Sequence, residues 1–370
     1  MCLHGYEIER GWQKLRLFPT LRNYQKENLG KDILAGLIIM AVSIPISMGY
    51  AQIAGLPAVY GLYGSVLPIL FFAVFSTSPQ FIFGVDAAPA ALVGSALLSL
   101  EIESGSEEAM RAVPVLTLFV ALWLFAFSYM KAGKLVNYIS APVMGGFITG
   151  ICTTIILMQV PKLFGGSAGV GEFFELAMHI GESLEKLNLP SLLLGLAALF
   201  ILLLSKKLIP KFPMAVLLMA AGACMTKFLP LKDWGVVTLS AVEPGLMPFA
   251  LPDISVIPVR EAVTISLSVA IVIMAETLLA ENSFAQKNGY RINDNQEIFA
   301  FAMGNFIAAL TGCCPINGSV SRTAMGEQYQ ARTQLTGIVA GIWRNRLYWL
   351  PSGTDPDGDR HFRTFGCDGI

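Results

Sequence analysis

The stretch between Asp32 and Glu101 carries a single charged residue, Asp86. Residues 33–85 are uncharged and predominantly apolar, which is long enough for two membrane crossings of about 20 residues each. A third apolar run, 87–100, is too short to cross as a straight helix, and Asp86 stands at its start. Because a charge inside a membrane is costly and is usually paired or functional, this pattern predicts an all-α polytopic membrane protein with a broken helix near mid-bilayer.

The composition agrees with a membrane protein. Hydrophobic residues make up 54% and charged residues 14% of the chain, whereas an average soluble domain has about 25% charged residues. The net charge of −1 provides no basic field, so nucleic acid is not an expected partner. The three histidines are scattered and the six cysteines lack zinc spacing. We therefore expect no enzyme active site, no metal site and no cofactor.

Charged loops separate the apolar runs and alternate in sign. The N-terminal segment, residues 1–32, is basic, the next charged loop is acidic, and the alternation continues along the chain. By the positive-inside rule the N-terminus is cytoplasmic and odd-numbered segments run outward across the plasma (inner) membrane. The expected segments are roughly 33–53, 55–76, 87–100, 112–130, 135–160, 190–205, 213–229, 262–280, 297–312, 319–330 and a start at about 333.

Two stretches, residues 83–89 and 315–323, place glycine, proline and an Asx residue just before a short helix. The first N–H groups of a helix lack partners and carry a partial positive charge. Two such ends facing each other inside a membrane would form an anion site. Ser319 and Ser321 would add hydroxyl donors, and Arg322 would add a full positive charge.

The alternative is a purely structural role for the same stretches. Asp86 and Asn317 are good N-cap residues, glycine and proline can mark a re-entrant turn, and serines are common at helix contacts in membranes. Arg322 favours the anion site, because a cation inside an apolar run needs a partner.

Glu276 is the other charge well inside an apolar run, residues 262–280. A charged residue at a helix centre costs about 3 kcal/mol on insertion scales. Burial favours the neutral form of a carboxyl group, so Glu276 is a candidate proton carrier. The alternative is a structural salt bridge with Arg322. The two interpretations are compatible, because a pair that breaks on protonation can couple proton binding to movement.

The sequence resembles the SulP anion-permease family, to which prestin belongs, from about residue 12 to about residue 341. The resemblance is carried by long and specific stretches, which are residues 32–36, 44–51, 55–63 and 318–324. It implies an inverted-repeat fold of seven plus seven segments, arranged as a core domain and a gate domain. In this family the core moves against the gate like an elevator, and two copies form a homodimer.

The resemblance also places an anion between the N-termini of the third and tenth segments. Glu276 matches the acidic position associated with cation coupling, by a proton or by sodium. The anion-binding residues implied in this way are Ala87 and Ala88 through their backbone, and Ser319, Ser321 and Arg322 on the opposite side.

Two departures from the family concern this site. Ile46 stands where the family usually has glutamine after the proline of the first segment. Residues 84–86 read Gly-Val-Asp, where the family usually has Gly-Pro followed by small residues. A carboxylate at Asp86 would repel an anion unless it is protonated, caps the helix or is turned away.

A third departure lies at the end of the chain. Residues 33–342 form the expected transmembrane domain, with an incomplete second repeat, and residues 343–370 form a polar tail. The family continues with further segments and a cytoplasmic STAS domain, and the tail resembles neither. We interpret the tail as the product of a frameshift or truncation. The alternative is a genuinely short homologue with a disordered tail.

The function predicted from these observations is proton-coupled symport of a small inorganic anion, either a sulfate-like oxyanion or bicarbonate. One alternative is a nucleobase permease of the same architecture. Another is a truncated fragment that does not transport, or an anion-binding membrane module. Arg322 and the serine-lined helix ends favour an anion over a nucleobase.

Overall fold

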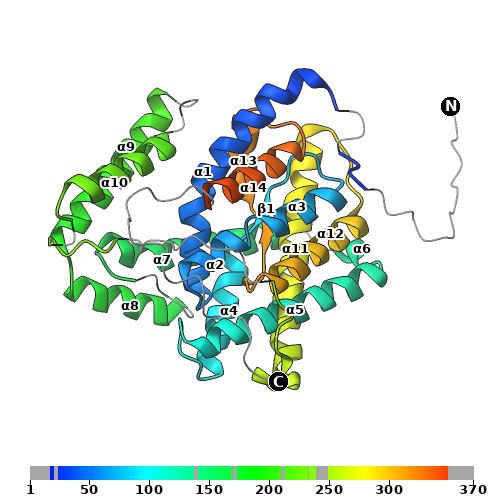
Figure 1. The fold of residues 1–370 in the computed structure, drawn as a ribbon, viewed down its shortest axis with the longest axis horizontal. Coiled ribbons are helices and arrows are strands. Elements are labelled where there is room, and N and C mark those ends of the chain that lie inside the picture. The colour runs from blue at the N-terminus through cyan, green and yellow to red at the C-terminus, as the bar shows by residue number, and fades with distance from the viewer. Residues whose placement is uncertain are drawn as a thin grey trace, which may run out of the picture.

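The structure is a computed structural model that describes residues 17–20, 24–136, 141–167, 169, 173–209, 212, 214–231, 233–238 and 249–348. Most of the N-terminal segment and residues 349–370 of the predicted tail lie outside this part. The described chain is predominantly helical (Figure 1). Its elements are η1 (Lys26–Asn28), α1 (Leu29–Ile53), α2 (Ala58–Tyr63), α3 (Leu67–Phe75), β1 (Phe83–Gly84), α4 (Ala87–Ser99), α5 (Glu107–Tyr129), α6 (Gly133–Val136), α7 (Ala141–Leu163), α8 (Phe173–Glu185), α9 (Leu189–Leu208), α10 (Met214–Phe228), η2 (Ile254–Val256), α11 (Val259–Asn288), α12 (Asp294–Leu310), β2 (Asn317–Gly318), α13 (Val320–Gln328) and α14 (Leu335–Tyr348).

Each predicted membrane segment contains a helix, whereas α8 lies between two predicted segments. Among the described residues, 5 helical stretches are long and apolar enough to cross a membrane, and α4 and α10 are shorter apolar helices. The second predicted segment is divided into α2 and α3, which together are one of those stretches. The eleventh segment begins at Leu335, and its helix continues past residue 342, the predicted end of the domain, to Tyr348.

The packing of the first segments against the later ones has the symmetry of an inverted repeat. If α1, α3, α4 and α5 correspond to α11, α12, α13 and α14, then the contact of α1 with α14 is the counterpart of the contact between α11 and α5. Exchanging the two repeats turns the contact of α3 with α12 into itself, and the same holds for the pairing of β1 with β2. The two repeats are therefore interleaved rather than placed side by side.

Close contact between α1 and α2 depends on a missing side chain. A Cβ atom at Gly61 would lie 2.0 Å from the backbone oxygen of Ser47. The Ser65 hydroxyl, in the same turn region, donates to the Ser47 hydroxyl at 2.8 Å. Glycine therefore allows the first segment to pack against the chain that follows it.

The helices α9 and α10 lie beside each other and apart from the bundle of α3, α5, α11 and α12 (Figure 1). Large apolar side chains of α9 are exposed, including Leu193 at 60%, Phe200 at 64% and Leu203 at 62%. In a chain that spans a membrane, such a face suits contact with lipid or with another membrane-embedded surface.

Asp32 is the clearest difference from the sequence-based expectation. It was expected to flank the first segment, but α1 begins at Leu29 and Asp32 is completely buried. Its carboxylate accepts hydrogen bonds from Arg332 N at 2.6 Å, from Thr333 Oγ1 at 2.7 Å and from Thr333 N and Thr336 Oγ1, both at 3.3 Å. These bonds attach the start of α1 to the start of α14.

Glu297 makes a similar connection elsewhere. It is also completely buried, and it accepts from Ser76 Oγ at 2.9 Å, from Ser78 N at 3.0 Å, and from both the backbone N–H and the hydroxyl of Thr77. These bonds hold the segment after α3 against α12. The same segment leads directly into β1.

Candidate functional site

The two interrupted segments meet at a short antiparallel pair of strands. Phe83 of β1 lies opposite Gly318 of β2, and Gly84 lies opposite Asn317. Because α4 and α13 begin within three residues of these strands, the pairing brings two helix N-termini together. A Cβ atom at Gly318 would lie 2.2 Å from a ring carbon of Phe81, so glycine is needed at this crossing.

Asp86 is the N-cap of α4. Its Oδ1 accepts from the N–H of Ala87, the first residue of the helix, at 2.8 Å. The N-cap of α13 is Ser319, whose side chain makes no capping bond. Asn317, the expected cap at this end, instead belongs to β2, two residues earlier. The two helix ends therefore differ: a carboxylate occupies one, and the other has no acceptor from its own cap.

Arg322 lies in the first turn of α13, and its side chain is 1% exposed. Its Nη2 donates to the backbone oxygen of Val85 at 2.7 Å and lies 3.6 Å from Asp86 Oδ2. Its Nε and Nη1 are buried without a hydrogen-bond partner. A Cβ atom at Gly84 would lie 3.0 Å from Nη1, so this glycine makes room for the guanidinium. A buried cation with unused donors is suited to an additional acceptor, such as an anion.

Glu276 approaches the site from α11. Its Oε2 accepts from Asn317 Nδ2 at 2.7 Å, and the Oδ1 of Asn317 accepts from the Thr277 hydroxyl. The Thr277 hydroxyl oxygen in turn accepts from Gly318 N at 3.1 Å. Glu276 is thus connected to β2.

The alternative interpretation of a salt bridge between Glu276 and Arg322 is therefore wrong. The carboxylate partner of Arg322 in the described chain is Asp86. The reason is topological: Glu276 contacts β2 on its own repeat, while Arg322 extends across to the backbone that leads into α4.

The remaining predicted residues surround this centre. Ser319 is 2% exposed and its hydroxyl lies 3.4 Å from that of Ser321, which is exposed. Ala88 is half-buried, whereas the N–H of Ala87 is already engaged by Asp86. The structure thus brings the predicted residues together, but one of the two expected backbone donors is occupied.

Tyr50 and Asn317 were not predicted as site residues. The hydroxyl of Tyr50, on α1, lies within electrostatic reach of both Asp86 and Arg322. Asn317 links Glu276 to the strand pair. A sequence signal existed for Asn317, because it precedes the helix that carries Arg322, but its hydrogen-bond partners depend on the arrangement of α11.

The formal charge of the site follows from these contacts. Arg322 contributes one positive charge, and Asp86 and Glu276 contribute one negative charge each when ionised. The two carboxylates repel each other. The partial positive charges of two helix ends add to that of Arg322. The site therefore combines attraction for an anion with carboxylates that oppose it.

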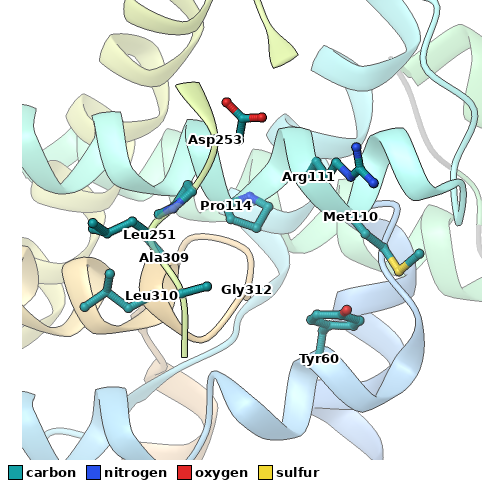
Figure 2. Close-up of a pocket in the computed structure, with 11 residues that line it drawn as sticks. Tyr60, Met110, Arg111, Pro114, Leu251, Asp253, Ala309, Leu310 and Gly312 are labelled. Atoms are coloured by element: carbon teal, nitrogen blue, oxygen red, sulfur yellow. The ribbon is translucent and has the colours of Figure 1, made fainter. Parts of the chain in front are cut away.

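A separate hollow of about 280 Å³ lies where α12 ends and α5 begins. Figure 2 shows the charged groups of Arg111 and Asp253 on one side and the ring of Tyr60 on the other. Its lining is mostly apolar and shares no residue with the strand-pair site. Asp253 is solvent-exposed, and hydrogen bonds from Ser255 lower the pKa of its carboxyl. The hollow is thus distinct from the membrane-buried charges.

These features define an inverted-repeat membrane protein with a polar site between two broken helices. Residues 29–344 match the Sulfate permease family, and the chain belongs to this family. It is 29% identical over 319 residues to the probable sulfate transporter MT1781 of Mycobacterium tuberculosis, covering 86% of this chain and 57% of that protein.

The fold is shared with solved structures. The structure of SLC26A9 superposes with a TM-score of 0.79 at 22% identity and covers 90% of this chain and 56% of the other. The transmembrane domain of the cyanobacterial bicarbonate transporter BicA gives a TM-score of 0.74 at 18% identity, covering 88% and 83%. These likenesses confirm the predicted inverted-repeat membrane fold. The chain spans about half the length of the curated relatives it matches.

Proposed function

We propose that this chain carries the anion-binding core of a secondary transporter for a small inorganic oxyanion, with sulfate as the first candidate and bicarbonate as the second. The observation that carries the proposal is Arg322, which is buried between two helix N-termini with Nε and Nη1 unused. The sulfate transporter among the relatives and the bicarbonate transporter among the solved structures support the same class of ligand.

The proposed ligand lies between the N-terminus of α4 and that of α13. It accepts hydrogen bonds from the free donors of Arg322 and from the backbone of Ala88. Ser321, which is exposed beside Ser319, donates its hydroxyl. Hydrogen bonds to charged groups are short and strong, so a few such donors give useful affinity. A nucleobase would leave the charge of Arg322 without an anionic partner, which favours the oxyanion.

We further propose that Glu276 is a coupling residue and that the coupling ion is a proton, with sodium as the alternative. Glu276 is half-buried and contacts the strand pair through Asn317, so its charge acts directly on the site. A proton that favours anion binding must itself bind more tightly when the anion is present.

The remaining proposals concern the assembly in the membrane. The alternation of loop charge supports a cytoplasmic N-terminus in the plasma (inner) membrane. The exposed apolar side chains of α9 support contact with lipid or with a second copy in a homodimer.

Equilibrium binding of radiolabelled sulfate to the purified chain tests the proposed function. Arg322→Ala removes a charged donor and should weaken binding by about 1.5–3 kcal/mol, at least about tenfold in Kd. Arg332→Ala is the matched control, because Arg332 is exposed in the loop before α14 and only its backbone N–H is used, by Asp32. Equal sulfate affinity in both variants and the wild type would contradict the site, as would sulfate binding too weak to detect under every condition. Bicarbonate and chloride serve as competitors.

A further inference from the structure

The carboxylate of Asp86 stands where an anionic ligand would be expected. Its Oδ1 accepts from the first N–H of α4 at 2.8 Å, and its Oδ2 lies 3.6 Å from Arg322 Nη2. These are two of the sources of positive potential that the site offers, a helix N-terminus and a buried guanidinium. Asp86 thus occupies one of the expected backbone donors, and it shares the guanidinium that would hold a bound oxyanion.

The carboxylate of Asp86 is also more accessible to water than the cation beside it. Its side chain is 19% exposed, against 1% for Arg322. The charged and titratable groups that face it are Arg322 from α13, Glu276 from α11 and Tyr50 from α1. Arg322 attracts the charge of Asp86, whereas Glu276 repels it. A bound anion would repel it further, because it would add a negative charge and share Arg322.

We propose that Asp86 is an internal anion that occupies the site in the absence of substrate, and that oxyanion binding is linked to the uptake of one proton by its carboxylate. This inference rests on the proposed function. In the linked step a proton from solvent forms an O–H bond on Asp86, and the side-chain charge changes from −1 to zero. The neutral carboxyl then competes less for Ala87 and Arg322, and its new O–H group can donate to the bound anion.

The charge balance gives the step a physical reason. With Asp86 and Glu276 ionised, the site and Arg322 carry a formal charge of −1. A divalent oxyanion would make it −3 if no proton followed. One proton on each carboxylate returns the loaded site to −1, the charge of the empty site. The proposed substrate class is therefore an oxyanion that binds together with protons.

The pH dependence of sulfate binding tests this linkage. For each proton taken up with the anion, the apparent Kd for sulfate rises by about tenfold with each unit increase in pH. This holds over the pH range in which the carboxylate is ionised in the empty site. Asp86→Asn keeps a good N-cap side chain but cannot bind this proton. The variant should bind sulfate more tightly than the wild type at neutral pH. Its Kd should also rise less steeply with pH, by about one factor of ten per pH unit less than that of the wild type.

Three other variants make the result specific. Glu276→Gln tests the second carboxylate by itself, and the double variant should be nearly independent of pH. Asp253→Asn is the matched control, because Asp253 is also an N-cap aspartate, that of η2, but lies outside the site. It should retain the wild-type pH dependence.

A direct proton count on the wild type makes the proposal testable even if a variant does not fold. Sulfate added to weakly buffered protein should take up protons, measured with an indicator dye, and Asp86→Asn should take up one fewer per bound anion. Wild-type binding without proton uptake would overturn the linkage, since Asp86 would then move aside as an anion. Equal proton counts in the wild type and Asp86→Asn would also overturn it. If Arg322→Ala still weakens binding in either case, the proposed function stands and only this inference fails.

Discussion

Two pairs of membrane-buried carboxylates in this chain differ in how fully they are satisfied. Asp32 and Glu297 are completely buried, and each accepts four hydrogen bonds from backbone N–H groups and hydroxyls. Asp86 and Glu276 are half-buried, and the structure records one hydrogen bond for each. Asp86 and Glu276 interrupt apolar sequence, whereas Asp32 and Glu297 stand at the polar starts of their segments.

The difference indicates what each pair can do. A buried carboxylate with a complete set of donors can change its partners only at a high cost, and it holds two segments at a fixed separation. A carboxylate with few donors, next to a cation that also has unused donors, can change its partners at lower cost. The first pair therefore maintains the arrangement of the repeats, and the second pair is available for ligand and proton.

The largest expected effect comes from Glu297. Glu297→Ala leaves the N–H groups of Thr77 and Ser78 and two hydroxyls without their acceptor, and each unsatisfied buried donor costs about 1–3 kcal/mol. The free energy of unfolding in detergent should fall by more than about 3 kcal/mol. Glu261→Ala, an exposed residue in the first turn of α11, should cost less than about 1 kcal/mol. Similar losses in both variants would remove the distinction drawn above.

Glu276→Gln should affect transport more than folding. Glutamine can still accept the hydrogen bond from Asn317, so sulfate binding should persist. It cannot carry a proton, so the accumulation of sulfate driven by an inward proton gradient should fall by about tenfold per pH unit of gradient. Uptake into vesicles with and without the gradient measures the effect. If this variant still accumulates sulfate fully under the gradient, Glu276 has a structural role like that of Asp32 and Glu297.

Ser321→Ala is expected to have the smallest effect of the three. It removes a neutral hydroxyl that could donate to the anion, and it should weaken sulfate binding by about tenfold. Ser99→Ala is a suitable control, because this hydroxyl lies at the far end of α4 and donates to Ala96 O at 2.8 Å. If Ser321→Ala binds sulfate as the control does, Ser321 lies outside the ligand's contacts.

The sequence alone predicted the segments well and the pairing of charges poorly. Membrane segments follow from local hydropathy, so α1, α5 and α11 were predicted at their places in the chain, although α5 begins before residue 112 and α11 continues past residue 280. Asp32 was placed outside its segment because its donors lie near residue 333, and no local pattern reveals them. Arg322 was correctly expected to need a partner, but its choice of Asp86 depends on how the two repeats interleave.

The site shows the same division. The facing helix ends could be expected from two matching interruptions in the chain. The occupation of one end by Asp86 could not be expected, because the sequence does not distinguish an aspartate that caps a helix from an aspartate that repels a ligand. The roles proposed for Ser319, Ser321 and Ala88 stay predictions until binding is measured.

The two-residue pairing of β1 with β2 has a consequence for how this chain can change over evolution. The antiparallel register places Phe83 opposite Gly318 and Gly84 opposite Asn317. A shift of one residue would turn every side chain of the moved strand to the opposite face. Inserting or deleting one residue next to either strand would displace a helix end from its partner and misdirect Asp86 or Arg322. We expect the lengths of these two connections to be inherited together, with changes in one accepted only alongside matching changes in the other.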